Sequence, residues 1–153
     1  MSYHRVGRIM RYLLFGLLLM ISFAVSSQDM WSTLGMVTFD RTFDAEFGMD
    51  MMTPNYNPVV LALNGKEVEV EGYFIALNGK NEQNHFMLSK FPQSTCFFCG
   101  KAGPETAMQV FLADGKKQKY SDEKIKVKGI LRINTTDPTG LLYTLEQAKS
   151  IDP

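Results

Sequence analysis

The chain has 153 residues, with 16 basic and 16 acidic side chains, two histidines and two cysteines. This length suits one domain whose hydrophobic core is large enough to fold without disulfide cross-links. Residues 1–26 hold three of the basic side chains and no acidic one, so residues 27–153 carry thirteen basic against sixteen acidic groups, a net charge of −3. A negatively charged chain is poorly matched to a phosphate backbone, and we therefore expect no nucleic-acid partner.

Residues 1–26 have the features of a secretory signal peptide. Arg5, Arg8 and Arg11 precede an apolar run over 13–25, and small residues follow it. That run is shorter than the about 20 residues of a membrane-spanning helix. No cysteine follows to accept a lipid. We expect a cleaved signal over 1–26 and an exported, non-lipidated single domain over 27–153, with an uncleaved N-terminal anchor as the alternative.

The first part of the domain has weak patterns. Loose alternation of apolar residues predicts an extended segment over 31–43. The stretch 44–58 is rich in Met, Asp, Asn and Pro and lacks periodicity, so it is predicted to be a connection. The apolar run 58–63 ends at Asn64–Gly65 and predicts a helical turn or a brief strand before a turn.

The strongest pattern lies over 66–77. Apolar and acidic residues alternate there with a period of two, which predicts a long strand with one solvated face. A turn over 78–82 and an apolar segment over 85–89 predict a hairpin. A third strand is expected over 106–112, closed by the turn at Asp114–Gly115.

The same pattern recurs over 125–133, with Gly129 in the position that Gly72 has in the earlier strand. Glycine inside a strand permits a bulge or a tight bend. A last strand is expected over 141–145, and a short helical or frayed tail over 146–151. Five or six short strands without a long helix predict an all-β, mainly β chain that forms a small oligonucleotide/oligosaccharide-binding (OB)-like barrel of five to six strands. A β-sandwich is the alternative.

Cys96 and Cys99, the only cysteines, have C-x-x-C spacing. In an exported protein such a pair forms a local disulfide, half of a metal site or a redox couple. The residues that follow, Gly100, Gly103 and Pro104, favour irregular backbone. Thioredoxin-type couples instead open a helix, whose dipole lowers the pKa of the first thiol. A c-type haem site is excluded because it requires histidine at the position of Gly100.

A tetrahedral zinc site needs two ligands besides the thiolates of Cys96 and Cys99. The candidates are His85, the only histidine of residues 27–153, and, if the fold brings them close, Glu105, Asp114 and Asp137. A plain disulfide that stiffens the loop is the competing interpretation. Methionine thioethers can also bind Cu(I), although packing explains most methionines more simply. Those concerned here are Met30, Met36, Met49, Met51 and Met52.

The segment 97–100, the segment 102–105 and the strand pattern over 65–75 resemble a domain-of-unknown-function family of secreted Gram-negative proteins with an OB-type barrel. The resemblance runs from Trp31 to about Ala148 and centres on a C-F-F-C-G-x-A-G-P-E core. Lys101 stands where a glycine is expected in the family. The resemblance implies no established enzymatic activity, and it implies an association of some relatives with ABC-type transport systems, including metal uptake. The signature loop it assigns consists of Cys96, Cys99, Gly100, Gly103, Pro104 and Glu105.

These observations predict a periplasmic binding or accessory protein rather than an enzyme. Its 96–105 loop is expected to bind a metal ion, with zinc as the candidate cofactor, or to dock on an ABC-type membrane transport complex. One alternative is a thiol-disulfide redox protein in which Cys96 attacks and Cys99 resolves. The other is a structural envelope protein with an inert disulfide between the same two cysteines. No catalytic residue is assigned.

Overall fold

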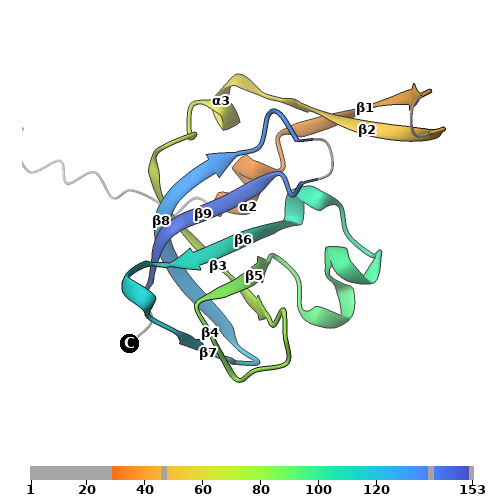
Figure 1. Ribbon diagram of the computed structural model, residues 1–153. Coiled ribbons are helices and arrows are strands. Elements are labelled where there is room, and N and C mark those ends of the chain that lie inside the picture. The colour runs from red at the N-terminus through yellow and green to blue at the C-terminus, as the bar shows by residue number, and fades with distance from the viewer. Residues whose placement is uncertain (1–28, 46–47, 138–139, 152–153) are drawn as a thin grey trace, which may run out of the picture.

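The computed structural model describes residues 29–45, 48–137 and 140–151 (Figure 1). The predicted signal peptide over 1–26 lies outside the described residues. None of the helices in the described ranges is long and apolar enough to cross a membrane. Within the described ranges the α-helices are α2 (Met30–Leu34) and α3 (Pro58–Leu61). The strands there are β1 (Val37–Asp44), β2 (Met49–Tyr56), β3 (Glu67–Ile75), β4 (Glu82–Gln83), β5 (His85–Ser89), β6 (Ala107–Leu112), β7 (Gln118–Lys119), β8 (Lys124–Ile133) and β9 (Tyr143–Ser150).

Five strands close into a barrel in the order β3-β5-β6-β9-β8. Neighbouring strands are antiparallel except β6 and β9, which are parallel. The strands predicted over 66–77, 85–89 and 125–133 are observed as β3, β5 and β8. The predicted all-β, OB-like barrel is therefore confirmed, and the alternative β-sandwich is wrong (Figure 1).

The alternation in β3 separates a buried face from a solvated one. Val68 and Val70 lie in the core, whereas the glutamates between them are exposed. These glutamates meet lysines of β8, with Lys128 Nζ 2.9 Å from Glu67 Oε1 and Lys124 Nζ 3.6 Å from Glu71 Oε1. Exposed ion pairs of this kind add little stability. The strand is held mainly by its apolar face.

Two glycines allow the barrel to close. A Cβ atom on Gly72 would lie 2.6 Å from the carbonyl oxygen of Ser89, and one on Gly129 would lie 2.8 Å from that of Glu146. Both positions therefore require close approach of neighbouring backbone, which only glycine allows. The pairing of β8 with β9 shifts register at Gly129, which faces two residues of β9, Gln147 and Ala148. Gln147 has a positive φ of 49°.

The extended segment predicted over 31–43 is wrong in its first part, because α2 covers Met30–Leu34 and β1 begins only at Val37. The Asp29 side chain accepts a hydrogen bond from the Trp31 amide and caps the helix. Trp31 and Leu34 are spaced i, i+3, so both lie on the buried side of α2. The Trp31 Nε1–H donates to the Glu71 carbonyl oxygen at 2.7 Å and fixes the helix to β3.

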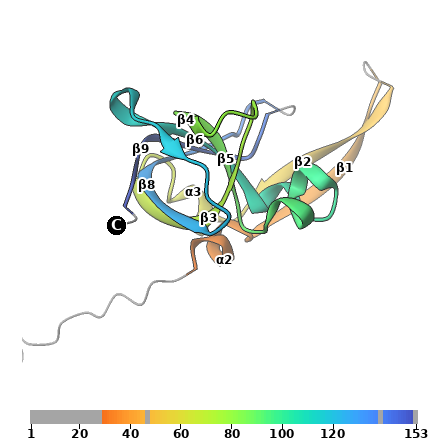
Figure 2. The ribbon, with the colours of Figure 1, turned by 90° about the horizontal axis from the view of Figure 1, so that it is seen from below.

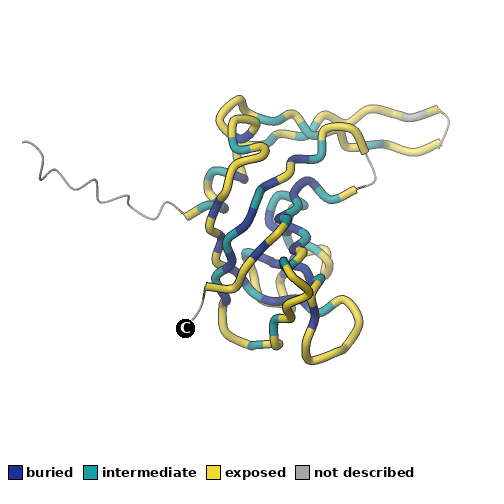
Figure 3. Tube along the Cα trace, turned by 60° about the vertical axis from the view of Figure 1, so that its left-hand side comes forward, coloured by how far each residue is buried: buried dark blue, intermediate teal, exposed yellow. Residues whose placement is uncertain are grey.

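The connection predicted over 44–58 is also wrong, because it contains β2. This strand pairs with β1 along its whole length, from Val37 opposite Tyr56 to Asp44 opposite Met49. The resulting ribbon extends away from the barrel (Figures 1 and 2), and Figure 3 shows that most of it is exposed. Because neither face of its outer half is buried, the sequence has no alternation there.

The helical or frayed tail predicted over 146–151 is wrong as well, since β9 continues to Ser150. The bulge at Gln147 inserts one residue and breaks the period-two pattern. By contrast, the helical turn among the alternatives for 58–63 is observed as α3, which Asn57 caps through Val59 N–H.

Candidate thiol site in the β5–β6 loop

The two cysteines lie in the loop that joins β5 to β6, over residues 90–106. The loop contains three 3₁₀ turns, at Gln93–Thr95, Phe97–Cys99 and Pro104–Thr106. Its ends are held together where the Lys90 amide donates to the Thr106 carbonyl oxygen at 2.9 Å. In both Figure 1 and Figure 2 the loop leaves the same side of the barrel as the β1–β2 ribbon.

A 3₁₀ turn brings the two thiols together. Residues i and i+3 lie above one another in such a turn, and the Cys99 amide donates to the Cys96 carbonyl oxygen at 3.1 Å. The two Sγ atoms are 4.0 Å apart. Gly100 ends the turn with a φ of 69°, a conformation that favours glycine, while its amide donates to the Phe97 carbonyl oxygen. Gly100 therefore has a structural role in the β5–β6 loop.

The two cysteines differ in accessibility. Cys96 is only 1% exposed, whereas Cys99 is exposed. The Cys99 thiol donates to the Gln93 carbonyl oxygen at 2.8 Å. The pKa of Cys99 is raised, first by the loss of hydration of its thiolate and then by the hydrogen bond and charge of Cys96, while Lys101 opposes the shift. At neutral pH the accessible sulfur is therefore a protonated thiol.

The structure describes a dithiol, because both cysteines are free. A disulfide bond would require the sulfurs to be about 2.05 Å apart. Two thiolates on one tetrahedral zinc ion, at Zn–S distances of about 2.3 Å, are separated by about 3.8 Å. The observed 4.0 Å is close to that separation. The separation is thus too long for a disulfide bond and compatible with two sulfur ligands on one ion.

The structure does not bring His85 or Glu105 to the sulfurs. Among the described residues, no three His, Cys, Asp or Glu side chains gather in a group that could hold a metal ion. His85 shares a hydrogen bond through Nε2 with Gln109 Oε1, at 3.1 Å. The Glu105 carboxylate lies over Gly103, in the space that a Cβ atom there would occupy. Gly103 and Glu105 therefore shape the end of the loop.

The methionines of β2 do not converge into one thioether cluster. Met51 lies opposite Thr42 and Met52 opposite Arg41. Adjacent residues of a strand point to opposite faces, so Met52 is separated from Met49 and Met51 by the ribbon itself. A copper site on these three residues is not supported by their placement.

Sequence reasoning missed two residues that share a barrel face with His85. Gln109 bonds to its ring, and Phe111 stacks on it with ring centroids 4.1 Å apart. In the predicted strand 106–112, alternate residues point to the same face, so Gln109 and Phe111 share one face. This alternation is the feature of the sequence that could have identified them.

No protein-family model and no curated protein matches the chain. Among solved structures, it is similar to the crystal structure of a DUF3299 family protein from Pseudomonas aeruginosa. The two are 19% identical, with a TM-score of 0.42, over 63% of this chain and 68% of that chain.

Proposed function

We propose that this chain is an exported, periplasmic and non-enzymatic module that binds a soft metal ion, with zinc as the first candidate, through Cys96 and Cys99. The observation that carries the proposal is the 4.0 Å separation of the two Sγ atoms on one short turn. Thiolates are preferred ligands of zinc and Cu(I).

Two sulfurs fill half of a tetrahedral site. Because the described residues offer no third ligand beside them, the remaining positions are left to water or to a partner protein. An open site of this kind suits an accessory protein that passes an ion on, as expected for a component of an ABC-type transport complex. The loop that carries the cysteines is prominent on the barrel surface, and Phe98 beside them is 49% exposed. This exposed ring favours contact with a partner.

The redox alternative is supported less well. Reactive thiols have a lowered pKa, whereas that of Cys99 is raised. The exposure of the two cysteines also favours the opposite assignment of the attacking and resolving thiols. Cys99 would have to attack an external disulfide, because Cys96 is buried.

The metal content of the reduced protein tests the proposal. After equilibration with Zn²⁺ or Cu(I) and gel filtration, we expect one ion per chain by mass spectrometry of the metal. Cys96→Ser and Cys99→Ser should each lose it. His85→Gln and Glu105→Gln are matched controls that should keep it, since neither side chain lies at the sulfurs. If the double variant Cys96→Ser, Cys99→Ser contained as much metal per chain as the native protein, the proposal would be refuted.

A further inference from the structure

A pocket of about 290 Å³ lies at the end of the barrel formed by the β3–β5 connection and the turn before β7. It is separate from the thiol loop. The pocket is lined by Leu77, Asn78, Lys80, Glu82, Gln83, Asn84, His85 and Lys117. Their side chains offer amide, imidazole, ammonium and carboxylate groups, so the pocket is polar.

A two-stranded sheet holds the two connections that form this pocket. In β4 and β7, Glu82 pairs with Lys119 and Gln83 pairs with Gln118. Gln83 is itself buried, and it fixes the turn that carries Lys80. Its Oε1 accepts from the Leu77 amide at 3.1 Å, and its Nε2 donates to the Lys80 carbonyl oxygen at 3.0 Å. The pocket is therefore held in shape by the protein alone.

An aromatic surface adjoins the pocket. The rings of His85 and Phe111 stack at 4.1 Å with an interplanar angle of 11°. The hydrogen bond from His85 to Gln109 fixes the orientation of the imidazole. Phe111 lies outside the pocket lining, but it is 40% exposed, so its ring offers an apolar surface next to His85.

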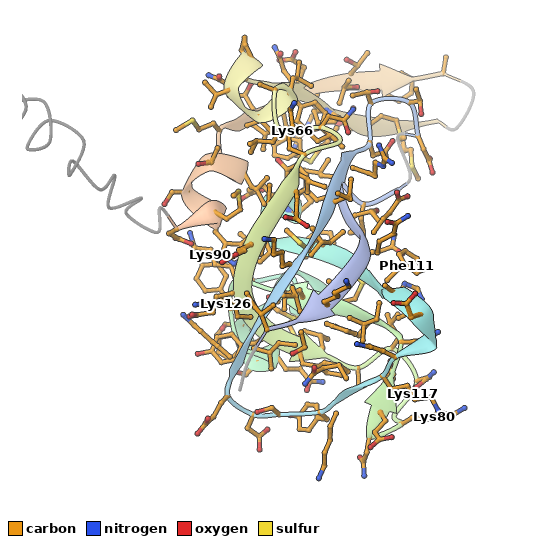
Figure 4. All side chains as sticks on the ribbon, turned by 90° about the vertical axis from the view of Figure 1, so that its left-hand side faces the viewer. Lys66, Lys80, Lys90, Phe111, Lys117 and Lys126 are labelled. Carbon is orange, nitrogen blue, oxygen red and sulfur yellow. The ribbon has the colours of Figure 1, made fainter. Side chains whose placement is uncertain are left out.

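The pocket has two ammonium groups and one carboxylate. Lys80 and Lys117 take part in none of the ion pairs found among the described residues. Figure 4 shows both at one end of the barrel, with Phe111 farther along the same side. Glu82 supplies the single carboxylate, and the exposed Lys116 and Lys119 add positive charge nearby. The two lysines outnumber the one carboxylate of the lining, so the pocket favours an anion.

We propose that this pocket binds an acidic sugar. The carboxylate or phosphate of one ring lies at Lys80 and Lys117 in the pocket, and the apolar face of a neighbouring ring of the same sugar chain reaches past His85 to Phe111. The amide of Asn84 and the imidazole of His85 are placed to bind hydroxyl groups. The volume lies just below the range of about 300–1,000 Å³ for drug-sized ligands, which suits one ring rather than a long chain of stacked bases. This site uses none of the residues of the proposed metal site.

Calorimetry with trigalacturonic acid, and with maltotriose as its neutral counterpart, tests the proposal. We expect the acidic trisaccharide to bind and its affinity to fall with added salt. Phe111→Ala should weaken binding about tenfold, as removal of a stacking ring does for bases. Lys80→Gln and Lys117→Gln should each weaken it about threefold. Lys90→Gln, far from the pocket lining, should have no effect.

Three results would overturn the proposal: no binding of the acidic sugar, equal binding of maltotriose, or tighter binding of an oligothymidylate under the same conditions. Unchanged affinity in Phe111→Ala would also overturn it. Thermal unfolding of each variant shows whether the barrel is intact. The double Cys96→Ser, Cys99→Ser variant should bind the sugar normally, so failure of the metal proposal and failure of this one are distinguishable.

Discussion

The hydroxyl of Tyr143 donates to the carbonyl oxygen of Leu34 at 2.6 Å, and both residues are fully buried. They are 109 positions apart in the sequence. The bond links the start of β9 to the end of α2, so the N-terminal helix is joined to the barrel at a second point besides Trp31. The fold therefore includes α2 as part of its core.

Replacing Tyr143 by Phe should lower the free energy of unfolding at neutral pH by about 1 kcal/mol, because a buried hydrogen bond is lost. Burial, with the charges of Tyr56 and Glu105, raises the pKa of Tyr143 far above its usual value. The folded state therefore keeps the proton at pH values where the unfolded chain, with a tyrosine pKa of about 10, loses it. Stability from this group is present below pH 10 and is lost as the pH rises further.

Urea denaturation of the two proteins at pH 8 and pH 11 measures this effect. The advantage of the native chain over Tyr143→Phe should shrink at pH 11. A difference that stays the same at both pH values would show that Tyr143 is not held protonated by the fold.

Gly72→Ala and Gly129→Ala should each destabilise the barrel by about 2–4 kcal/mol, since the new methyl groups meet backbone carbonyl oxygens that cannot easily move. Chemical denaturation provides the measurement. Lys116→Ala, on an exposed turn, is the control and should change stability by less than about 0.5 kcal/mol. Near-neutral glycine variants would mean that the strands do not approach as closely as described.

Gln147 has a positive φ of 49° at the bulge in β9. Gln147→Gly should leave stability within about 0.5 kcal/mol, because relief of strain offsets the entropy cost of glycine. Gln147→Val should cost about 2 kcal/mol, since a β-branched side chain is strained in this conformation. If valine were tolerated as well as glycine, the bulge would not have this backbone geometry.

Burial on one face explains which parts of the fold the sequence could predict. In β3 and β8 the core requires an apolar residue at every second position, so the pattern is visible. The β1–β2 ribbon is held by its own backbone pairing. Its apolar residues such as Phe43 and Met52 are exposed, so no core imposes an alternating pattern on them. In β9 the extra residue at Gln147 interrupts the alternation of buried and exposed positions, so the second half of the strand no longer continues the pattern of the first.

The candidate site could be predicted only where it is local. Cys96 and Cys99 are three residues apart, so spacing alone indicates that their side chains meet in a turn. His85 lies on the strand before the loop, but its ring is held by Gln109 and Phe111 of the neighbouring strand. Such contacts depend on strand register, which C-x-x-C spacing does not encode.

Alkylation of the thiols with iodoacetamide, followed by intact mass measurement with and without Zn²⁺, tests the metal proposal most directly. In the reduced, metal-free chain we expect rapid labelling of the exposed Cys99 and slow labelling of the buried Cys96. Zinc should suppress the rapid label in the native chain but not in Cys96→Ser. Rapid labelling that zinc leaves unchanged in the native chain, or suppresses equally in Cys96→Ser, would contradict a two-sulfur metal site.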